Sequence, residues 1–297
     1  MPTPRTGRYL AAVVAAVVLT APLAGCGDSE PAPAAGAEHA DDGHESSADA
    51  SALPGSHVHA VGVNPPDKAV YLATHEGLFR YGADGPARVG PVIDLMGFTV
   101  AGPDHFYASG HPGEGVDLPQ PVGLIESTDG GNTWAGLSRQ GESDFHALTS
   151  SAAGVLGFDG KLRATSDGEK WRELDAPAAP YALAASPDGE VLLGTTETGL
   201  IRSEDGGKTW DTVADAPPVI LVAWAAGDTV LGALPDGTIV MSGDAGSAWH
   251  PMGKVEGQPY ALGAAPDAAG DNAGVLVVTE DAVLRSTDGG ASFRPVT

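Results

Sequence analysis

Short apolar runs separated by polar, glycine-containing turns dominate the chain from residue 57 onward. Apolar segments such as "GLIE" (123–126), "GLIRS" (199–203) and "AVLRS" (282–286) each precede a polar stretch, and another short strand-like segment follows it. Runs of this length, bounded by Gly, Asp and Ser, are typical of β-strands joined by tight turns. The pattern therefore predicts an all-β domain.

The polar stretches repeat one another. They read "STDGGNTW" (127–134), "TSDGEKW" (165–171), "SEDGGKTW" (203–210), "SGDAGSAW" (242–249) and "STDGGASF" (286–293). Their closing aromatic residues recur at intervals of 37, 39, 39 and 44 residues. Four-stranded units repeated about 40 residues apart predict the blades of a β-propeller. Counting units from their first strand gives six, which start near His57, Asp94, Asp144, Tyr181, Val219 and Tyr260.

These five stretches, called boxes below, resemble the Asp-box (BNR) repeat of sialidases, sortilin-type receptors and photosystem II assembly-factor propellers. The resemblance covers residues 57–297, although the first unit carries only a degenerate "YGADGPARV" (81–89). It implies a six-bladed β-propeller of four-stranded antiparallel blades with Asp-box turns. An aspartate at such a turn accepts backbone N–H groups, and the closing Trp or Phe packs between neighbouring sheets. We therefore expect structural roles for Asp129, Asp167, Asp205, Asp244 and Asp288, and mostly buried side chains for Trp134, Trp171, Trp210 and Trp249.

The N-terminal segment predicts secretion and anchoring. Two arginines precede an apolar run at residues 10–19, which is too short to span a bilayer and fits a signal peptide over 1–25. The sequence Leu23-Ala24-Gly25-Cys26 resembles a bacterial lipobox, which implies lipidation of Cys26. Residues 26–54 lack large apolar groups and predict a disordered acidic Ala/Pro-rich tether, followed by the propeller at 55–297. We expect a lipoprotein on the outer face of the cell membrane.

Charge narrows the choice of partners. The chain carries 39 Asp and Glu against 15 Lys and Arg, a net charge of −24. Loss of Arg5 and Arg8 with the signal peptide makes the mature chain −26. This charge argues against binding nucleic acid and favours cations or a small ligand. Cys26 is the only cysteine, so no intramolecular disulfide can form. We also expect the protein to be a monomer.

Five histidines fall on one face of the predicted propeller. In an antiparallel four-stranded meander, the turn after the second strand lies at the same end as the start of the first strand, and the box turn lies at the opposite end. Two histidines begin the first strand of unit 1, and one begins that of unit 3; two others end the second strands of units 1 and 2. These residues are His57, His59, His146, His75 and His111.

Alignment of the first strands adds further metal-ligand candidates. Superposing "HVHAV", "DLMGF" and "DFHAL" puts Met96 level with His59 and His146, and puts Asp94 and Asp144 level with His57. Imidazole is the commonest transition-metal ligand, a thioether adds affinity for Cu(I), and carboxylate suits Zn(II) or Cu(II). The hypothesis is a copper or, second, a zinc site at the channel mouth of units 1 to 3. The alternative is that these side chains merely form hydrogen bonds in a wet channel mouth.

A glycoside hydrolase is the rival interpretation, because the resemblance includes sialidases and bacterial proteins labelled glycosylhydrolase-like. The candidate catalytic carboxylates are Glu114, Asp117, Glu142 and Asp144, with Tyr181 and Tyr260 as a sugar platform. The arginine triad of sialidases is not visible, because Arg80, Arg163, Arg202 and Arg285 occupy repeated third-strand positions. Whether the chain is an enzyme therefore stays open, and a protein-binding or assembly-factor scaffold is a third interpretation. The long connection at 111–123 is a candidate lid over the mouth.

Overall fold

The computed structural model describes residues 53–55, 57–82, 84–266 and 273–296. These residues form 24 β-strands, and none of them lies in a helix, so no helix in this part of the chain is suited to crossing a membrane. The predicted signal peptide, Cys26 and nearly all of the tether lie outside the described residues.

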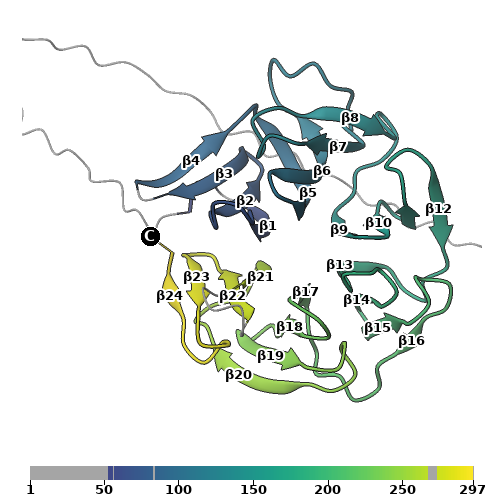
Figure 1. Cartoon of the computed structure of the whole chain (residues 1–297), viewed down its shortest axis with the longest axis vertical. Coiled ribbons are helices and arrows are strands. Elements are labelled where there is room, and N and C mark those ends of the chain that lie inside the picture. Colours follow the sequence, from purple (N-terminus) through teal and green to yellow (C-terminus); the bar gives the residue numbers. More distant parts are fainter. Residues whose placement is uncertain (1–52, 56, 83, 267–272, 297) are drawn as a thin grey trace, which may run out of the picture. The chain divides into compact units, whose positions relative to one another are not determined.

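The strands form six separate four-stranded antiparallel sheets arranged as blades around a central axis (Figure 1). This confirms the predicted all-β six-bladed propeller. Blade 1 holds β1 (Val58–Val63), β2 (Val70–Thr74), β3 (Gly77–Gly82) and β4 (Gly85–Val89). Blade 2 holds β5 (Ile93–Gly102), β6 (His105–Pro112), β7 (Leu124–Ser127) and β8 (Ala135–Ser138). Blade 3 holds β9 (Ala147–Ser151), β10 (Gly154–Phe158), β11 (Leu162–Thr165) and β12 (Trp171–Leu174).

The other three blades follow in chain order. Blade 4 holds β13 (Pro180–Ala185), β14 (Leu192–Thr196), β15 (Gly199–Ser203) and β16 (Asp211–Thr212). Blade 5 holds β17 (Leu221–Trp224), β18 (Val230–Ala233), β19 (Thr238–Ser242) and β20 (His250–Lys254). Blade 6 holds β21 (Ala261–Pro266), β22 (Ala273–Val278), β23 (Val283–Ser286) and β24 (Arg294–Pro295). The first strand of each blade faces the axis and begins within three residues of the start predicted for its unit (Figure 1).

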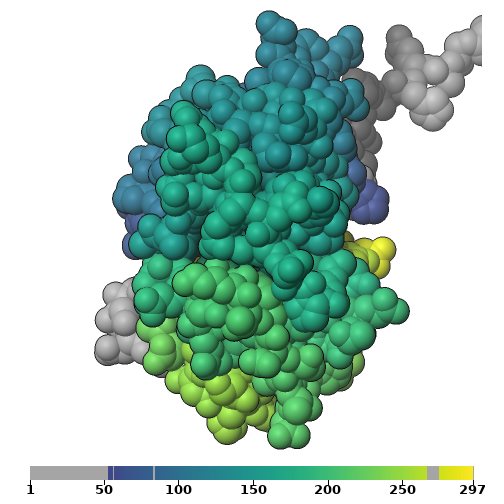
Figure 2. Space-filling model, turned by 90° about the vertical axis from the view of Figure 1, so that its right-hand side faces the viewer, coloured from purple at the N-terminus to yellow at the C-terminus, as the bar shows by residue number. Residues whose placement is uncertain are grey.

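The hydrophobic core lies between neighbouring blades. Between blades 1 and 2, for example, Tyr71 and Leu78 pack with Phe106 and Ile125, and the Tyr71 and Phe106 rings meet edge to face at 5.0 Å. Every blade is built from one continuous segment, so each colour forms a compact block in the side view of Figure 2. The ring consequently closes without a shared strand, through a cluster of buried side chains from blades 1 and 6.

The five boxes share one hydrogen-bonding pattern at the turn between the third and fourth strands. The Ser or Thr that opens each box donates its hydroxyl hydrogen to the box aspartate at 2.7–3.1 Å. In four boxes a backbone N–H four residues later donates to that same hydroxyl oxygen at 2.8 Å. The box at 165–171 is one residue shorter, and Asp167 instead accepts the N–H groups of Glu169 and Lys170. The box aspartates therefore hold turns.

The closing tryptophans are mostly buried, as expected. Each packs against the cluster between its own blade and the preceding one, and only a minor part of each stays accessible; they are Trp134, Trp171, Trp210 and Trp249. They sit where the fourth strand of each blade begins.

Candidate functional site: a histidine and aspartate cluster at the channel mouth

A central cavity of about 1270 Å³ runs along the inner strands of all six blades. At the end where these strands begin, its lining includes Met96 and seven of the polar residues singled out from the sequence: His57, His59, Glu142, Asp144, His146, Tyr181 and Tyr260. No Lys or Arg is among the described residues that line it, although Arg139 and Arg163 contact lining carboxylates. The mouth is therefore rich in imidazole and carboxylate.

Irregular backbone at the start of the inner strands presents several of these side chains. The pairing register shifts around His59 in β1, Met96 in β5 and Tyr181 in β13, so that each is an extra residue opposite its partner strand. A β-bulge of this kind breaks strict alternation and redirects a side chain. Three of the mouth residues thus owe their placement to bulges at equivalent positions of three blades.

Alternation between core and mouth places the two aspartates. In β5 Ile93 and Leu95 are buried, and Asp94 between them lies on the other face of the strand. Phe145 is fully buried between Asp144 and His146. Its backbone N–H donates to the buried Ser109 Oγ of β6 at 2.9 Å.

Ser109 is therefore a positioning residue that sequence reasoning missed. It ties the 144–146 segment of blade 3 to blade 2. The letters "SGH" gave no signal for this, because a serine inside a strand has no distinctive pattern.

Asp94 joins the histidines of blades 1 and 2. Its Oδ1 lies 2.9 Å from His75 Nδ1, and its Oδ2 lies 3.6 Å from His111 Nδ1. His75 comes from the turn after β2, and His111 pairs with Asp94 across β5 and β6. One carboxylate thus faces an imidazole on each side.

Asp144 continues the chain of contacts into blade 3. Its Oδ2 lies 3.4 Å from His111 Nε2 and 2.7 Å from His146 Nε2, and the second contact is a hydrogen bond. His111 therefore sits between two carboxylates, with one ring nitrogen toward each.

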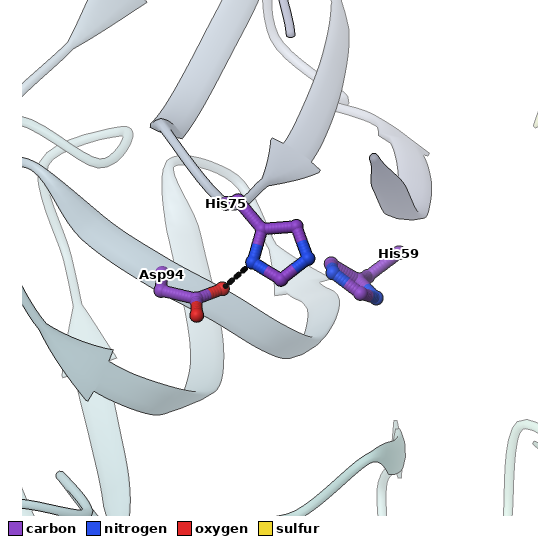
Figure 3. Close-up of side chains that lie close together, drawn as sticks. All are labelled: His59, His75 and Asp94. Atoms are coloured by element: carbon purple, nitrogen blue, oxygen red, sulfur yellow. Dashed lines mark ion pairs between the residues drawn. The ribbon is translucent and has the colours of Figure 1, made fainter. Parts of the chain in front are cut away.

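His59 of β1 and His57, which precedes that strand, lie beside His75. The ring centroids of His57 and His59 lie 5.1 and 4.7 Å from that of His75, both edge to face. Figure 3 shows the His75 ring between Asp94 and His59, with its second nitrogen toward His59. One donor atom each from His59, His75 and Asp94 lies within 4.8 Å of the other two.

Burial leaves some of these polar atoms without partners. His59 Nε2 and Asp144 Oδ1 are buried and have no hydrogen-bond partner among the described residues, whereas Asp94 Oδ1 faces His75 Nδ1 at 2.9 Å. Burial lowers the pKa of His59, and the neighbouring His75 lowers it further, so the His59 imidazole is neutral at neutral pH. A neutral, unpartnered ring nitrogen is available as a ligand.

Met96 lines the cavity but has no polar contact with the cluster in the described part of the chain. The bulge in β5 makes Met96 the extra residue, as the bulge in β1 does for His59, so the two occupy equivalent positions as the alignment predicted.

The candidate catalytic carboxylates separate into two groups. Glu114 and Asp117 are exposed, lie in the connection between β6 and β7, and do not line the cavity. The same connection packs Val116 and Leu118 against the core between blades 1 and 2, which anchors the candidate lid to the body of the propeller.

Glu142 and Asp144 both line the cavity. Glu142 is exposed, and its carboxylate lies 3.4 Å from Arg139 Nη1. Asp144 is engaged by two histidines, as described above.

The sequence did not predict a role for Asp159, a carboxylate whose side chain is buried. It follows β10 at the turn equivalent to those of His75 and His111, and it lines the cavity. Its pKa is lowered because hydrogen bonds from Ser143 and the ion pair with Arg163 outweigh the opposing effect of burial. Arg139 also contacts it, so two guanidinium groups neutralise Asp159. The signal in the sequence was the place of Asp159 directly after the second strand of its unit, a position at which only histidines were considered.

Comparison with known proteins shows the fold. No protein-family model and no curated protein sequence matches the chain. The solved structure of a GH74 enzyme from Niastella koreensis is similar, with a TM-score of 0.53 and 19% identity over 81% of this chain. This chain spans only 37% of that enzyme's length.

Two YCF48 structures are also similar. YCF48 from Cyanidioschyzon merolae has a TM-score of 0.50 and 12% identity, covering 78% of this chain and 96% of that one. YCF48 bound to a D1 peptide has a TM-score of 0.50 and 15% identity, covering 82% and 83%. At these identities the likeness establishes a β-propeller and no activity.

Proposed function

We propose that this propeller binds a transition-metal ion at its channel mouth through His59, His75 and Asp94. The observation that carries the proposal is that one donor atom from each of these residues lies within 4.8 Å of the other two. Ligands around a tetrahedral ion with bonds near 2.1 Å are about 3.4 Å apart, so small side-chain movements complete the site. His57 adjoins the same His75 ring and supplies a fourth ligand or an outer partner.

The unpartnered atoms favour metal binding over a hydrogen-bonded polar mouth. In a mouth that is only polar, buried nitrogen and oxygen atoms are expected to find partners, because each unsatisfied group costs about 1–3 kcal/mol. His59 Nε2 and Asp144 Oδ1 lack such partners among the described residues. A cation held by His59, His75 and Asp94 would satisfy His59 Nε2.

The donor set favours Cu(II) or Zn(II). Imidazole with carboxylate suits both ions, whereas Cu(I) prefers sulfur ligands. The three donors that meet are two imidazoles and a carboxylate, which supports the divalent ions.

The compartment is a second part of the proposal. We propose that Cys26 is lipidated and that the domain works outside the cytoplasm on the membrane surface. The lipobox resemblance and the short apolar run before it support this location. A thiol-free metal site suits an oxidising compartment, where imidazole and carboxylate ligands stay unmodified.

Calorimetric titration of metal-stripped protein, purified without a His tag, tests the metal proposal. Wild type is expected to bind Cu(II) or Zn(II) saturably and more tightly than micromolar. His59→Ala and His75→Ala should each weaken the tightest binding at least tenfold, since each removes one of three ligands. His250→Ala is the matched control, because His250 is an exposed histidine at the start of β20, away from the cavity. Absence of saturable binding, or equal effects of all three substitutions, contradicts the proposal.

Glycoside hydrolysis is the second candidate. Glu142 and Asp144 line one cavity. Tyr181 and Tyr260, the two exposed large hydrophobic side chains among the described residues, lie at its mouth with 66% and 45% of their surface exposed. Hydrolysis of aryl glycosides that is lost in Asp144→Asn and Glu142→Gln, and is indifferent to chelators, would favour this candidate over metal binding.

A further inference from the structure

We infer that a pocket between blades 3 and 4 binds a small organic carboxylate with an apolar body, independently of the histidine cluster. The pocket has a volume of about 270 Å³ and lies between two neighbouring sheets of the ring (Figure 1). Its lining includes residues of the box at 165–171, and none of the described histidines is part of it. Small-molecule sites in proteins measure about 300–1,000 Å³, so the occupant is expected to be small.

An alanine in the third strand of blade 3 accounts for the pocket. Ala164 directly precedes its box, where the other four box-bearing blades carry a longer side chain: Glu126, Arg202, Met241 and Arg285. Arg202 Nε donates to the carbonyl oxygen of Ala245 in the next blade at 2.8 Å, and Met241 packs against the core between blades 5 and 6. Because Ala164 ends in a methyl group, the equivalent space between blades 3 and 4 stays open.

The inner wall of the pocket is apolar. Leu156 pairs with Ala164 across β10 and β11, and both line the pocket together with Val155 and Leu192. Trp171, which closes the box, adds an aromatic side chain to the lining. An apolar group placed against these side chains removes their surface from water, which favours binding.

Two cationic side chains give the pocket its charge. Lys170 and Arg172 line it, and neither forms an ion pair with a carboxylate among the described residues, unlike Lys161 and Arg163 of the same blade, which both pair with Glu173. The chain as a whole carries a net charge of −24. Two cations without a carboxylate partner at one pocket of such a chain favour an anionic ligand.

The guanidinium of Arg172 is held beside the open space. Arg172 pairs with Ala164 across β11 and β12, so the two side chains lie on the same face of the sheet. Its Nη2 donates to the carbonyl oxygen of Gly206 in blade 4 at 2.9 Å, which spans the gap between the blades. A guanidinium has five N–H donors, so others remain for a ligand, and it binds a carboxylate through two parallel hydrogen bonds.

Nuclear magnetic resonance titration of the full-length, ¹⁵N-labelled protein with hexanoate tests this inference. Hexylammonium is the matched probe, because it has the same number of carbon atoms and the opposite charge. Hexanoate is expected to shift the amide signals of Ala164 and Gly206 saturably, and hexylammonium is expected to leave them in place. Equal binding of the two probes, or no saturable shift with either, overturns the inference.

Substitution of the two cations tests the charge. Arg172→Gln should weaken hexanoate binding about tenfold, because it removes a charge-assisted pair of hydrogen bonds. Lys170→Gln should weaken it less, since lysine acts as a single point charge. Both side chains are exposed, so neither substitution disturbs the core.

The matched controls are Arg294→Gln and Lys208→Gln. Arg294 pairs with Arg285 in blade 6, at the position equivalent to that of Arg172, and Lys208 belongs to the box at 203–210. Neither lines the pocket, so both variants should bind hexanoate as wild type does. Equal affinities of Arg172→Gln and Arg294→Gln would contradict the role of the guanidinium and overturn the inference.

Ala164→Met should close the pocket without changing its charge. Blade 5 carries Met241 at the equivalent position, so the fold accommodates this side chain. Hexanoate binding should be lost, whereas the thermal unfolding temperature and the Zn(II) titration should match wild type. Wild-type hexanoate affinity in this variant would place the ligand elsewhere and overturn the inference. Because the metal titration is read separately, failure of either proposal leaves the other standing.

Discussion

At the scale of single residues, two glycines let the inner strand of blade 2 approach its neighbours at the mouth. A Cβ at Gly110, where φ is +145°, would lie 1.8 Å from the carbonyl oxygen of Asp94. A Cβ at Gly97 would lie 2.3 Å from that of Phe145 in blade 3. Real Cβ atoms do not approach an oxygen so closely, so both positions require glycine. Close backbone contact thereby brings Asp94 near His111 and brings blade 3 against blade 2.

Gly97→Ala is therefore expected to destabilise the protein by about 1–3 kcal/mol, the usual cost of forcing an extra methyl into a packed site. It should also weaken metal binding, because blade 3 must move away from β5. Chemical denaturation and the titration described above measure the two effects. The control is Gly243→Ala, since a Cβ there meets no atom within 4 Å and the backbone is not in the left-handed region. Equal stability of the two variants would contradict this prediction.

At the scale of elements, each box stabilises its own turn by local hydrogen bonds, and these turns lie on the face opposite the histidines. The pKa values of the five box aspartates are all lowered, mainly by hydrogen bonds to the carboxylate from the box's own backbone and hydroxyl groups. For Asp205 the backbone N–H and hydroxyl of Thr209 lower the pKa to about 2. The deprotonated form is thus favoured by folding.

This linkage predicts a loss of stability in acid. The pKa of an aspartate in the unfolded chain is near 3.8, so the contribution of Asp205 is complete above that value and declines as the pH falls toward 2. Asp205→Asn should lower the Tm relative to wild type at pH 7, and the difference should shrink between pH 4 and pH 2. Histidine titration is common to both proteins and cancels in the comparison. A Tm difference that stays constant over this range would show that the charge of Asp205 is irrelevant.

At the scale of the whole molecule, the ring closes through side-chain packing alone. Blades 1 and 6 contact each other through a buried cluster that includes Val61, Leu72, Leu276 and Val278. All four strands of blade 6 come from residues 261–295, so blade 6 contains no strand from the N-terminal part of the domain.

Substituting Cys26 tests the anchor. Cys26→Ala should release the protein from the membrane into the medium or the soluble fraction, because it removes the acylated residue and with it the membrane affinity of the acyl chains. Fractionation followed by mass analysis of the N-terminal peptide measures this. Ser29→Ala, in the predicted tether, serves as the control and should stay in the membrane fraction. A soluble wild type without lipid mass would contradict the prediction.

The sequence by itself determined the architecture and the face on which the histidines gather. Both depend on local information, because box turns, short apolar runs and repeat spacing are set within one blade of about 40 residues. Once each blade is an antiparallel meander, its strand ends are assigned to one face or the other by connectivity. His75 and His111 could therefore be placed with His146 although they are far apart in sequence.

Only the tertiary structure decided which of these side chains meet. Bulges at His59, Met96 and Tyr181 break the strict alternation of side chains along the inner strands, and nothing in the sequence indicated them. The pairing of Asp94 with His75 and His111, and the neutralisation of Asp159 by arginines, depend on distances between blades. Pattern along one strand cannot report such distances, because close packing of neighbouring sheets at positions such as Gly97 fixes them.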